Sequence, residues 1–191
     1  MKNRTRVVIV GMHRSGTSAF AELLHKNGID MGPVRDQNFE SRFYSWDLNY
    51  YLGFLGGTWD VPSSLERNVG TLHYETAKRF FVDRVEQRLA MHSKFRIYKR
   101  AIGFKHPIAS LLLPELSQVE NLKVIEIHRD PEEIVSSLIR RKPRKKLSFF
   151  PGQYGFSQHS LSEERMFRLT EFYHDTLNQN KNLVDLKVHY N

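Results

Sequence analysis

Cysteine is absent from the 191 residues of the chain. This absence excludes disulfides, thiolate metal sites and a cysteine nucleophile. Long hydrophobic runs are absent too, since no apolar stretch approaches the roughly 20 residues of a membrane-spanning helix. The basic N-terminus is followed by only four apolar residues, Val7 to Val10, before Gly11. That segment is too short for a signal peptide, and we therefore expect a soluble, cytoplasmic protein.

Internal repeats and low-complexity segments are also missing, and a content of 40% hydrophobic and 26% charged residues is ordinary for a globular protein. We expect residues 1–191 to form a single domain with a substantial core. Residues 140–159 combine basic residues, aromatics and glycines, which predicts a mobile lid or loop. The formal net charge of +8 favours an anionic partner, although it does not distinguish nucleic acid, membrane surface and polyanionic small molecule.

The stretch from Val7 to Phe20 predicts a phosphate-binding loop. Val7–Val10 are typical of a strand buried on both faces of a parallel sheet. A loop bounded by Gly11 and Gly16 then leads into an amphipathic helix. At such a helix N-terminus, backbone N–H groups and the helix dipole attract an anion.

This loop has the spacing of a nucleoside triphosphate P-loop but lacks its lysine. Thr17 stands where that lysine would reach the β- and γ-phosphates. Arg14, inside the loop, would supply the missing positive charge. The substitution disfavours ordinary ATP chemistry, so a P-loop kinase acting on a nucleotide or metabolite is an alternative rather than the first expectation.

Strand and helix patterns alternate along the chain, which predicts a three-layer α/β fold of the P-loop NTPase type. In that fold helices cover both faces of a central parallel sheet. The strands after the first are expected at residues 96–104, 122–127 and 186–190. Ligands of such sheets bind outside the carboxyl ends of the strands, and these ends carry the glycine loop, Lys105-His106 and His128-Arg129.

Three segments, in order, resemble motifs of sulfotransferases that use 3′-phosphoadenosine 5′-phosphosulfate. Residues 11–18, Gly-Met-His-Arg-Ser-Gly-Thr-Ser, are similar to the loop that binds the 5′-phosphosulfate. Residues 129–137, Arg-Asp-Pro-Glu-Glu-Ile-Val-Ser-Ser, resemble the motif whose arginine and serine hold the 3′-phosphate. Residues 103–107, Gly-Phe-Lys-His-Pro, resemble the lysine-bearing strand end between them. The three together are much more specific than any one of them.

The resemblance implies a role for each matching residue. Arg14 and Lys105 would stabilise the charge that spreads over the transferred group and the leaving phosphate. No acidic cluster suits a metal, and the family needs none. The residues expected to bind the cofactor, or its product 3′-phosphoadenosine 5′-phosphate, are His13, Arg14, Ser15, Gly16, Thr17, Ser18, Arg129 and Ser137.

The acceptor, a hydroxyl or amine on a carbohydrate or small metabolite, needs a general base. Phe39-Glu40 resembles the aromatic–glutamate motif of many bacterial relatives. In the cytosolic branch the base is a histidine two residues after the lysine, whereas His106 follows Lys105 directly. Glu40 is therefore favoured, with His106 as the alternative.

Two further features bear on these expectations. The basic run at 140–146 offers a second alternative, a non-catalytic nucleic-acid-binding protein, although nucleic acid is not the expected partner. The C-terminal glycine-rich basic motif of cytosolic sulfotransferases has no match here. Residues 186–191 resemble the start of a late family segment, so we expect a compact or truncated member. The acceptor's identity and the oligomeric state stay open.

Overall fold

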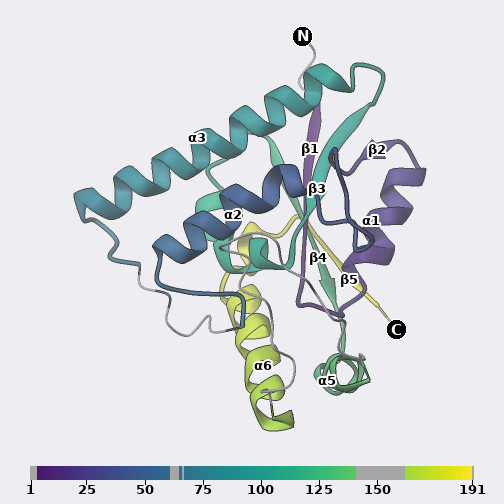
Figure 1. The fold of residues 1–191 in the computed structure, drawn as a ribbon, viewed down its shortest axis with the longest axis vertical. Coiled ribbons are helices and arrows are strands. Elements are labelled where there is room, and N and C mark those ends of the chain that lie inside the picture. The colour runs from purple at the N-terminus through teal and green to yellow at the C-terminus, as the bar shows by residue number, and fades with distance from the viewer. Residues whose placement is uncertain (1–3, 61–64, 66, 141–161, 191) are drawn as a thin grey trace.

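The computed structural model describes residues 4–60, 65, 67–140 and 162–190, and its centre is a five-stranded sheet. The strand order is β2-β3-β1-β4-β5, and every neighbouring pair is parallel. The strands are β1 (Thr5–Val10), β2 (Ile29–Asp30), β3 (Ala101–Lys105), β4 (Leu122–His128) and β5 (Leu186–His189). Helical elements connect these strands and lie on both faces of the sheet (Figure 1). The predicted three-layer α/β fold is confirmed.

The helical elements are α1 (Thr17–Lys26), α2 (Arg42–Phe54), α3 (Leu72–Phe95), η2 (Pro107–Leu112), α4 (Leu113–Leu116), α5 (Pro131–Ile139), α6 (Glu163–Gln179) and η4 (Lys181–Leu183). Of these, α1 lies on one side of the sheet and α2 and α3 lie on the other (Figure 1). No described helix combines the length and the apolar character that crossing a membrane requires.

The central strand β1 divides the core between the two faces, because successive side chains of a strand point to opposite sides. Val8 and Val10 belong to the larger core, with buried residues of α2, α3, η2, α5 and α6. Ile9 belongs to the smaller core, with Ala21 of α1 and Ile127 of β4. All three β1 side chains are fully buried, which explains why this strand contains no polar alternation.

The aromatic segment at 43–54 contributes to both core and surface. Tyr44 stacks on Phe104 with ring centroids 4.3 Å apart, and Tyr51 stacks on Phe81 at 4.4 Å. The other edge of α2 leaves Trp46 exposed. The helix is therefore anchored by its inner aromatic side chains, and its outer face is free of core contacts.

The prediction of a strand over 96–104 is wrong about where the strand begins. Helix α3 continues to Phe95, a turn follows, and β3 starts only at Ala101. The guanidinium of Arg4 donates to the carbonyl oxygens of Ser93, Arg96 and Ile97, which satisfies acceptors that a helix end leaves open. The apolar residues of 96–100 thus belong to a turn. Of the lid or loop predicted at 140–159, residues 141–159 lie outside the described part of the chain.

Candidate active site

The glycine loop connects β1 to α1 through residues in the left-handed region. The φ angles are +144° at Gly11, +72° at Arg14 and +94° at Gly16. A Cβ on Gly11 would lie 2.6 Å from the carbonyl oxygen of Ile127, so the strand and loop backbones approach too closely for a side chain. Helix α1 begins after Gly16 with no side-chain cap, so its first N–H groups remain available to an anion.

Ser15 gives the loop an unsatisfied polar group. Its side chain is buried, and its Oγ has no hydrogen-bond partner among the described residues. A Cβ on Gly11 would lie 2.8 Å from this oxygen, so the hydroxyl lies against the start of the loop. A buried hydroxyl without a partner is unfavourable, and an anion held in the loop would accept its hydrogen bond.

Residues of η2 and its N-cap hold the beginning of the loop by hydrogen bonds. The N–H of Gly11 donates to Oγ of Ser110 at 2.8 Å, and Ser110 is fully buried. The N–H of His106 donates to the carbonyl oxygen of Ile9 at 3.4 Å. Sequence reasoning missed Ser110, although a single serine within the apolar run from Ile108 to Leu113 was a usable signal.

Glu40 and Lys105 form an ion pair at the carboxyl end of β3. Nζ of Lys105 donates to Oε1 of Glu40 at 2.9 Å, and the lysine side chain is only 2% exposed. The two residues also form a parallel backbone bridge. Asp36 holds this loop, since its Oδ1 accepts from the N–H groups of Asn38 and Glu40 at 2.8 and 2.9 Å. The turn passes through Phe39 at φ +58°.

The charge of Glu40 is strongly stabilised. Burial raises the pKa of its carboxyl, but electrostatic interactions with His106, Lys105 and His13 outweigh burial and lower that pKa to about 2. The Lys105 ammonium also donates a hydrogen bond to the charged form. At neutral pH Glu40 is therefore a carboxylate and accepts a proton only weakly while Lys105 holds it.

His106 lies beside this pair in a buried position. Its Nε2 is 3.9 Å from Oε2 of Glu40, and its Nδ1 accepts from the N–H of Ile108 at 3.3 Å. Burial lowers its pKa, and nearby Lys105 lowers it further, while Glu40 raises it. The ring is accordingly neutral at pH 7, and since Nδ1 is the acceptor, the proton resides on Nε2.

A second group of residues lies at the end of β4 and on α5. Nε of Arg14 donates to Oγ of Ser137 at 3.0 Å, and Nη1 of Arg129 donates to the carbonyl oxygen of Arg14 at 3.0 Å. Nε of Arg129 also pairs with Glu133 at 2.8 Å. The structure thus brings together Arg14, Arg129 and Ser137, which lie far apart in the sequence.

Aromatic rings that the sequence did not mark as site residues flank the loop. A Cβ on Gly16 would lie 2.5 Å from the ring of Tyr190, so the tyrosine packs directly on the loop. Its ring centroid lies 5.4 Å from the guanidinium carbon of Arg129. On the other side, the His13 and Trp59 rings are 4.5 Å apart. His13 is therefore a contact residue of the loop wall.

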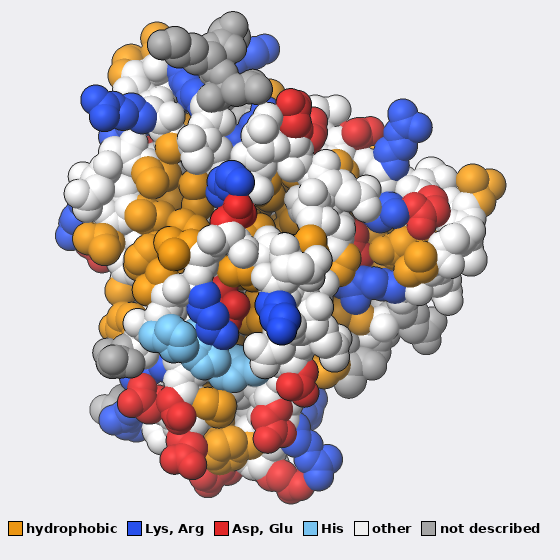
Figure 2. All heavy atoms as spheres, turned by 180° about the vertical axis from the view of Figure 1, so that it is seen from behind, with side chains coloured by type: hydrophobic (Ala, Val, Ile, Leu, Met, Phe, Trp, Pro, Cys, Tyr) orange, Lys and Arg blue, Asp and Glu red, His pale blue; other side chains and the backbone are white. Residues whose placement is uncertain are grey.

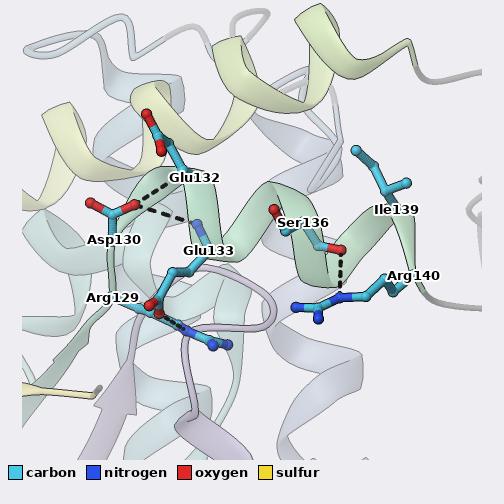
Figure 3. A pocket seen from close by; sticks show the side chains of 7 residues that line it. All are labelled: Arg129, Asp130, Glu132, Glu133, Ser136, Ile139 and Arg140. Carbon is cyan, nitrogen blue, oxygen red and sulfur yellow. Dashed lines mark hydrogen bonds and ion pairs between the residues drawn. The ribbon is translucent and has the colours of Figure 1, made fainter.

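A separate open groove of about 730 Å³ runs along the outer side of α5. Figure 3 shows its lining residues, Arg129, Asp130, Glu132, Glu133, Ser136, Ile139 and Arg140. Arg129 belongs to both this groove and the loop cluster, whereas Ser137 belongs only to the cluster. The groove borders the candidate site and does not contain it.

The described residues contain no group of three or more His, Asp or Glu side chains arranged to hold a metal ion.

The last two predicted loop residues lie at the start of the helix. Thr17 is buried and Ser18 half-buried, both in the first turn of α1. Together these features define an α/β protein whose glycine loop lies at the carboxyl ends of three neighbouring parallel strands.

Comparison with known proteins identifies the family. The model of the sulfotransferase domain matches residues 4–186, and the chain belongs to this family. Family membership supports a transferase with sulfotransferase activity. A search of the curated proteins gives no match.

Solved structures that match include two kinases and the protein TT1252. Shikimate kinase from Bacteroides thetaiotaomicron is 12% identical, covers 97% of this chain and 86% of its own, with a TM-score of 0.44. TT1252 from Thermus thermophilus is 14% identical, and the match covers 100% of this chain and 90% of TT1252, with a TM-score of 0.49. Deoxyadenosine kinase from M. mycoides with bound dCTP is 11% identical, and the match covers 97% of this chain and 90% of the kinase, with a TM-score of 0.45.

Proposed function

We propose that the protein transfers a sulfuryl group from 3′-phosphoadenosine 5′-phosphosulfate to a hydroxyl or amine of an acceptor such as a carbohydrate or small metabolite. The observation that carries the proposal is the convergence of two polar clusters on one loop. Arg14, Arg129 and Ser137 lie on one side, and Glu40 and Lys105 pair at the neighbouring strand end. The first cluster would bind the donor, and the second would assist the transfer to the acceptor.

The loop and α5 would hold the two anionic ends of the donor separately. The first N–H groups of α1, the side chains of Ser15, Thr17 and Ser18, and Arg14 would bind the 5′-phosphosulfate. The buried, unpartnered Ser15 hydroxyl supports a bound anion at this place. Arg129 and Ser137 would bind the 3′-phosphate, which ATP and AMP lack.

The residues at the end of β3 would assist the transfer. When bound, the donor supplies the sulfuryl group, which gains a bond to the acceptor oxygen as its bond to the phosphate oxygen breaks. Lys105 and Arg14 would stabilise the negative charge on the oxygens involved. Since Lys105 now neutralises Glu40, any anion that draws the ammonium away would raise the pKa of Glu40 and make it a better base.

Glu40 is a better candidate than His106 for the base that takes the acceptor's proton. In neutral His106, Nδ1 already accepts from the N–H of Ile108, and Nε2 carries the ring proton. Neither nitrogen is free to accept another proton. Oε2 of Glu40, by contrast, has His106 at 3.9 Å and is not the oxygen bonded to Lys105. His106 would then act by donating to the carboxylate and orienting it.

Calorimetric titration with 3′-phosphoadenosine 5′-phosphate tests the proposed donor site. We expect binding at micromolar concentration, weaker binding of AMP, and no dependence on magnesium. Arg129→Ala is expected to weaken the 3′-phosphate compound selectively. Arg140→Ala is the matched control, because Arg140 lies at the other end of α5 and its Nε donates to the carbonyl oxygen of Ser136.

The same titration separates the alternatives. Equal binding of AMP, or absence of binding at high micromolar concentration, would refute the proposed cofactor. Magnesium-dependent ATP binding would indicate a kinase. Salt-dependent binding of DNA or RNA that survives Arg14→Ala would indicate a nucleic-acid-binding protein.

A further inference from the structure

The turn between α3 and β3 exposes large apolar side chains at the end of the molecule remote from the glycine loop. Phe95, Ile97 and Tyr98 are 67%, 64% and 79% exposed, and Met91, one turn earlier on α3, is exposed as well. Figure 1 places this turn at the upper edge, beside the beginning of β1, whereas the strands run downward to the candidate site. Six residues of β1 separate the two ends by about 20 Å.

Positive charge surrounds these apolar side chains. Lys94 and Arg100 are exposed and Lys99 is half-buried, and none of the three forms an ion pair with a described residue. The buried carboxylate nearby, Asp30, already pairs with His92 at 3.1 Å and with Arg96 at 3.0 Å. Figure 2 shows hydrophobic and basic side chains next to one another at this upper edge.

The turn is held in place by bonds that leave its apolar side chains outside. Arg4 donates to the carbonyl oxygens of Ser93, Arg96 and Ile97 at 2.7, 3.0 and 2.8 Å. The side chain of Arg96, whose carbonyl oxygen accepts from Arg4, forms an ion pair with Asp30. The exposure of Phe95, Ile97 and Tyr98 is therefore built into the fold and requires no rearrangement before contact.

We propose that residues 91–100 form a docking surface for an anionic lipid membrane. Apolar side chains that protrude among cations suit the membrane–water interface, where the rings and aliphatic groups leave water and the cations meet lipid headgroups. Nucleic acid is a poorer match, because Met91 and Ile97 have no ring that could stack on a base. Docking in this orientation leaves the glycine loop facing solution.

Cosedimentation of the full chain with vesicles tests the proposal. The probes are vesicles of phosphatidylcholine alone and vesicles that also contain phosphatidylserine. We expect binding only to the second, weakened about fivefold for each cation removed. The combined variant Lys94→Gln, Lys99→Gln, Arg100→Gln should therefore bind on the order of 100-fold more weakly.

The apolar contribution needs its own variant and a matched control. Phe95→Ser, Ile97→Ser, Tyr98→Ser together should weaken vesicle binding by about tenfold or more. The control is Trp46→Ser with Tyr50→Ser, since both side chains are 66% exposed on α2 but lie outside the turn. Circular dichroism establishes that each variant is folded. In the single variant Tyr98→Trp, a blue shift of emission on adding anionic vesicles would report insertion without any loss of apolar surface.

Three outcomes would overturn the proposal. The first is that the wild-type chain stays in solution with anionic vesicles. The second is that the control variant loses as much binding as the turn variant. The third is binding to DNA or RNA that the charge variant loses and the apolar variant keeps, with no vesicle binding; the turn would then be a nucleic-acid contact.

Discussion

Ser136 and Ser137 are adjacent on α5, but they face different surroundings. Ser137 is buried and its Oγ accepts from Nε of Arg14, whereas Ser136 is exposed and lines the outer groove. Ser137→Ala removes a donor to the proposed 3′-phosphate and a partner of Arg14. We expect the affinity for 3′-phosphoadenosine 5′-phosphate to fall about tenfold, measured by calorimetry.

Ser136→Ala is the matched control for this prediction. It makes the same chemical change one residue away on the same helix, so its affinity should stay within about twofold of the wild type. Equal losses in the two variants would mean that the helix as a whole, and not the Ser137 hydroxyl, carries the effect.

Glu40 offers a second prediction at the level of a single side chain. Glu40→Gln keeps the shape of the side chain but removes the base, so we expect kcat to fall by roughly 10²- to 10⁴-fold. The measurement is transfer of radiolabelled sulfuryl groups onto pools of acceptors. Because Lys105 loses its buried partner, the melting temperature is measured alongside.

The pH dependence distinguishes Glu40 from His106 as the base. The pKa of Glu40 in the free protein is lowered to about 2, so kcat/KM, which reports the free enzyme, should stay level as the pH falls from 8 to about 5. A base at His106 would instead lose activity as the pH falls below the ordinary histidine value of 6.5. An acid limb below pH 6.5 that disappears in His106→Gln would assign the base to His106.

At the level of elements, the N-terminus of α5 carries a prediction about stability. Oδ1 of Asp130 accepts from the N–H groups of Glu132 and Glu133 at 2.8 and 3.4 Å. Asp130→Ala should lower the free energy of unfolding by about 1 kcal/mol and the melting temperature by about 2–4 °C. Asp130→Asn retains a capping oxygen and should leave both nearly unchanged. Similar losses in the two variants would show that the negative charge, rather than the cap, stabilises the helix.

The first strand and the turn after α3 show where the sequence predicted the fold well and where it did not. Local chemistry was sufficient for Val7–Val10, whose apolar run predicts a buried strand. Local chemistry failed at Ile97 and Tyr98, where apolar residues suggested a strand. The structure holds them in a turn through Arg4, which is remote in the sequence.

The candidate site could be predicted only in part, for the same reason. The motif residues Arg14, Arg129 and Ser137 were marked from the sequence, and the structure brings them within hydrogen-bonding contact. Ser110 and Tyr190 were missed, because their roles depend on packing against Gly11 and Gly16. Contacts of this kind become visible only when distant segments are folded together.

At the level of the whole molecule, the strand order assembles the site. β1 lies between β3 and β4, so the loop after β1 receives Lys105 from one neighbour and Arg129 from the other. The register that pairs Ile9 with Lys105 fixes the height of the ammonium relative to the loop. The strand β2 ends at Asp30, and Glu40, further along the chain, forms a parallel bridge with Lys105. This bridge places Glu40 beside the end of β3.

A buried polar network joins β2, α2 and α3 on the other side of the core. Nε2 of His92 lies 3.1 Å from Oδ1 of Asp30, and Nδ1 lies 2.9 Å from the hydroxyl of Tyr44. Burial lowers the pKa of His92 even though Asp30 raises it. Burial raises the pKa of Asp30, but its bonds from His92 and Gly32 and the charge of Arg35 lower it overall.

These shifts predict that acid destabilises the protein in two steps. A histidine with a lowered pKa stabilises the fold above the unfolded value of 6.5 and loses this contribution as the pH falls toward its folded pKa. The lowered pKa of Asp30 likewise contributes stability above the unfolded value of 3.8, and this contribution is lost as the pH falls further toward the folded pKa of Asp30. We expect the free energy of unfolding, from urea titrations between about pH 7 and 5, to fall by at most about 1.4 kcal/mol per pH unit for each such histidine.

His92→Phe isolates the contribution of this network. The variant should be less stable at pH 7 by about 1–3 kcal/mol, since Tyr44 and Asp30 lose a buried partner, but its stability should depend less on pH. Some slope remains, because His25, His106, His128 and His174 also have a lowered pKa. His73→Phe, at an exposed position, should keep the wild-type slope. If His92→Phe kept it too, the acid sensitivity would arise from the other histidines, and the buried network would stabilise the fold independently of pH.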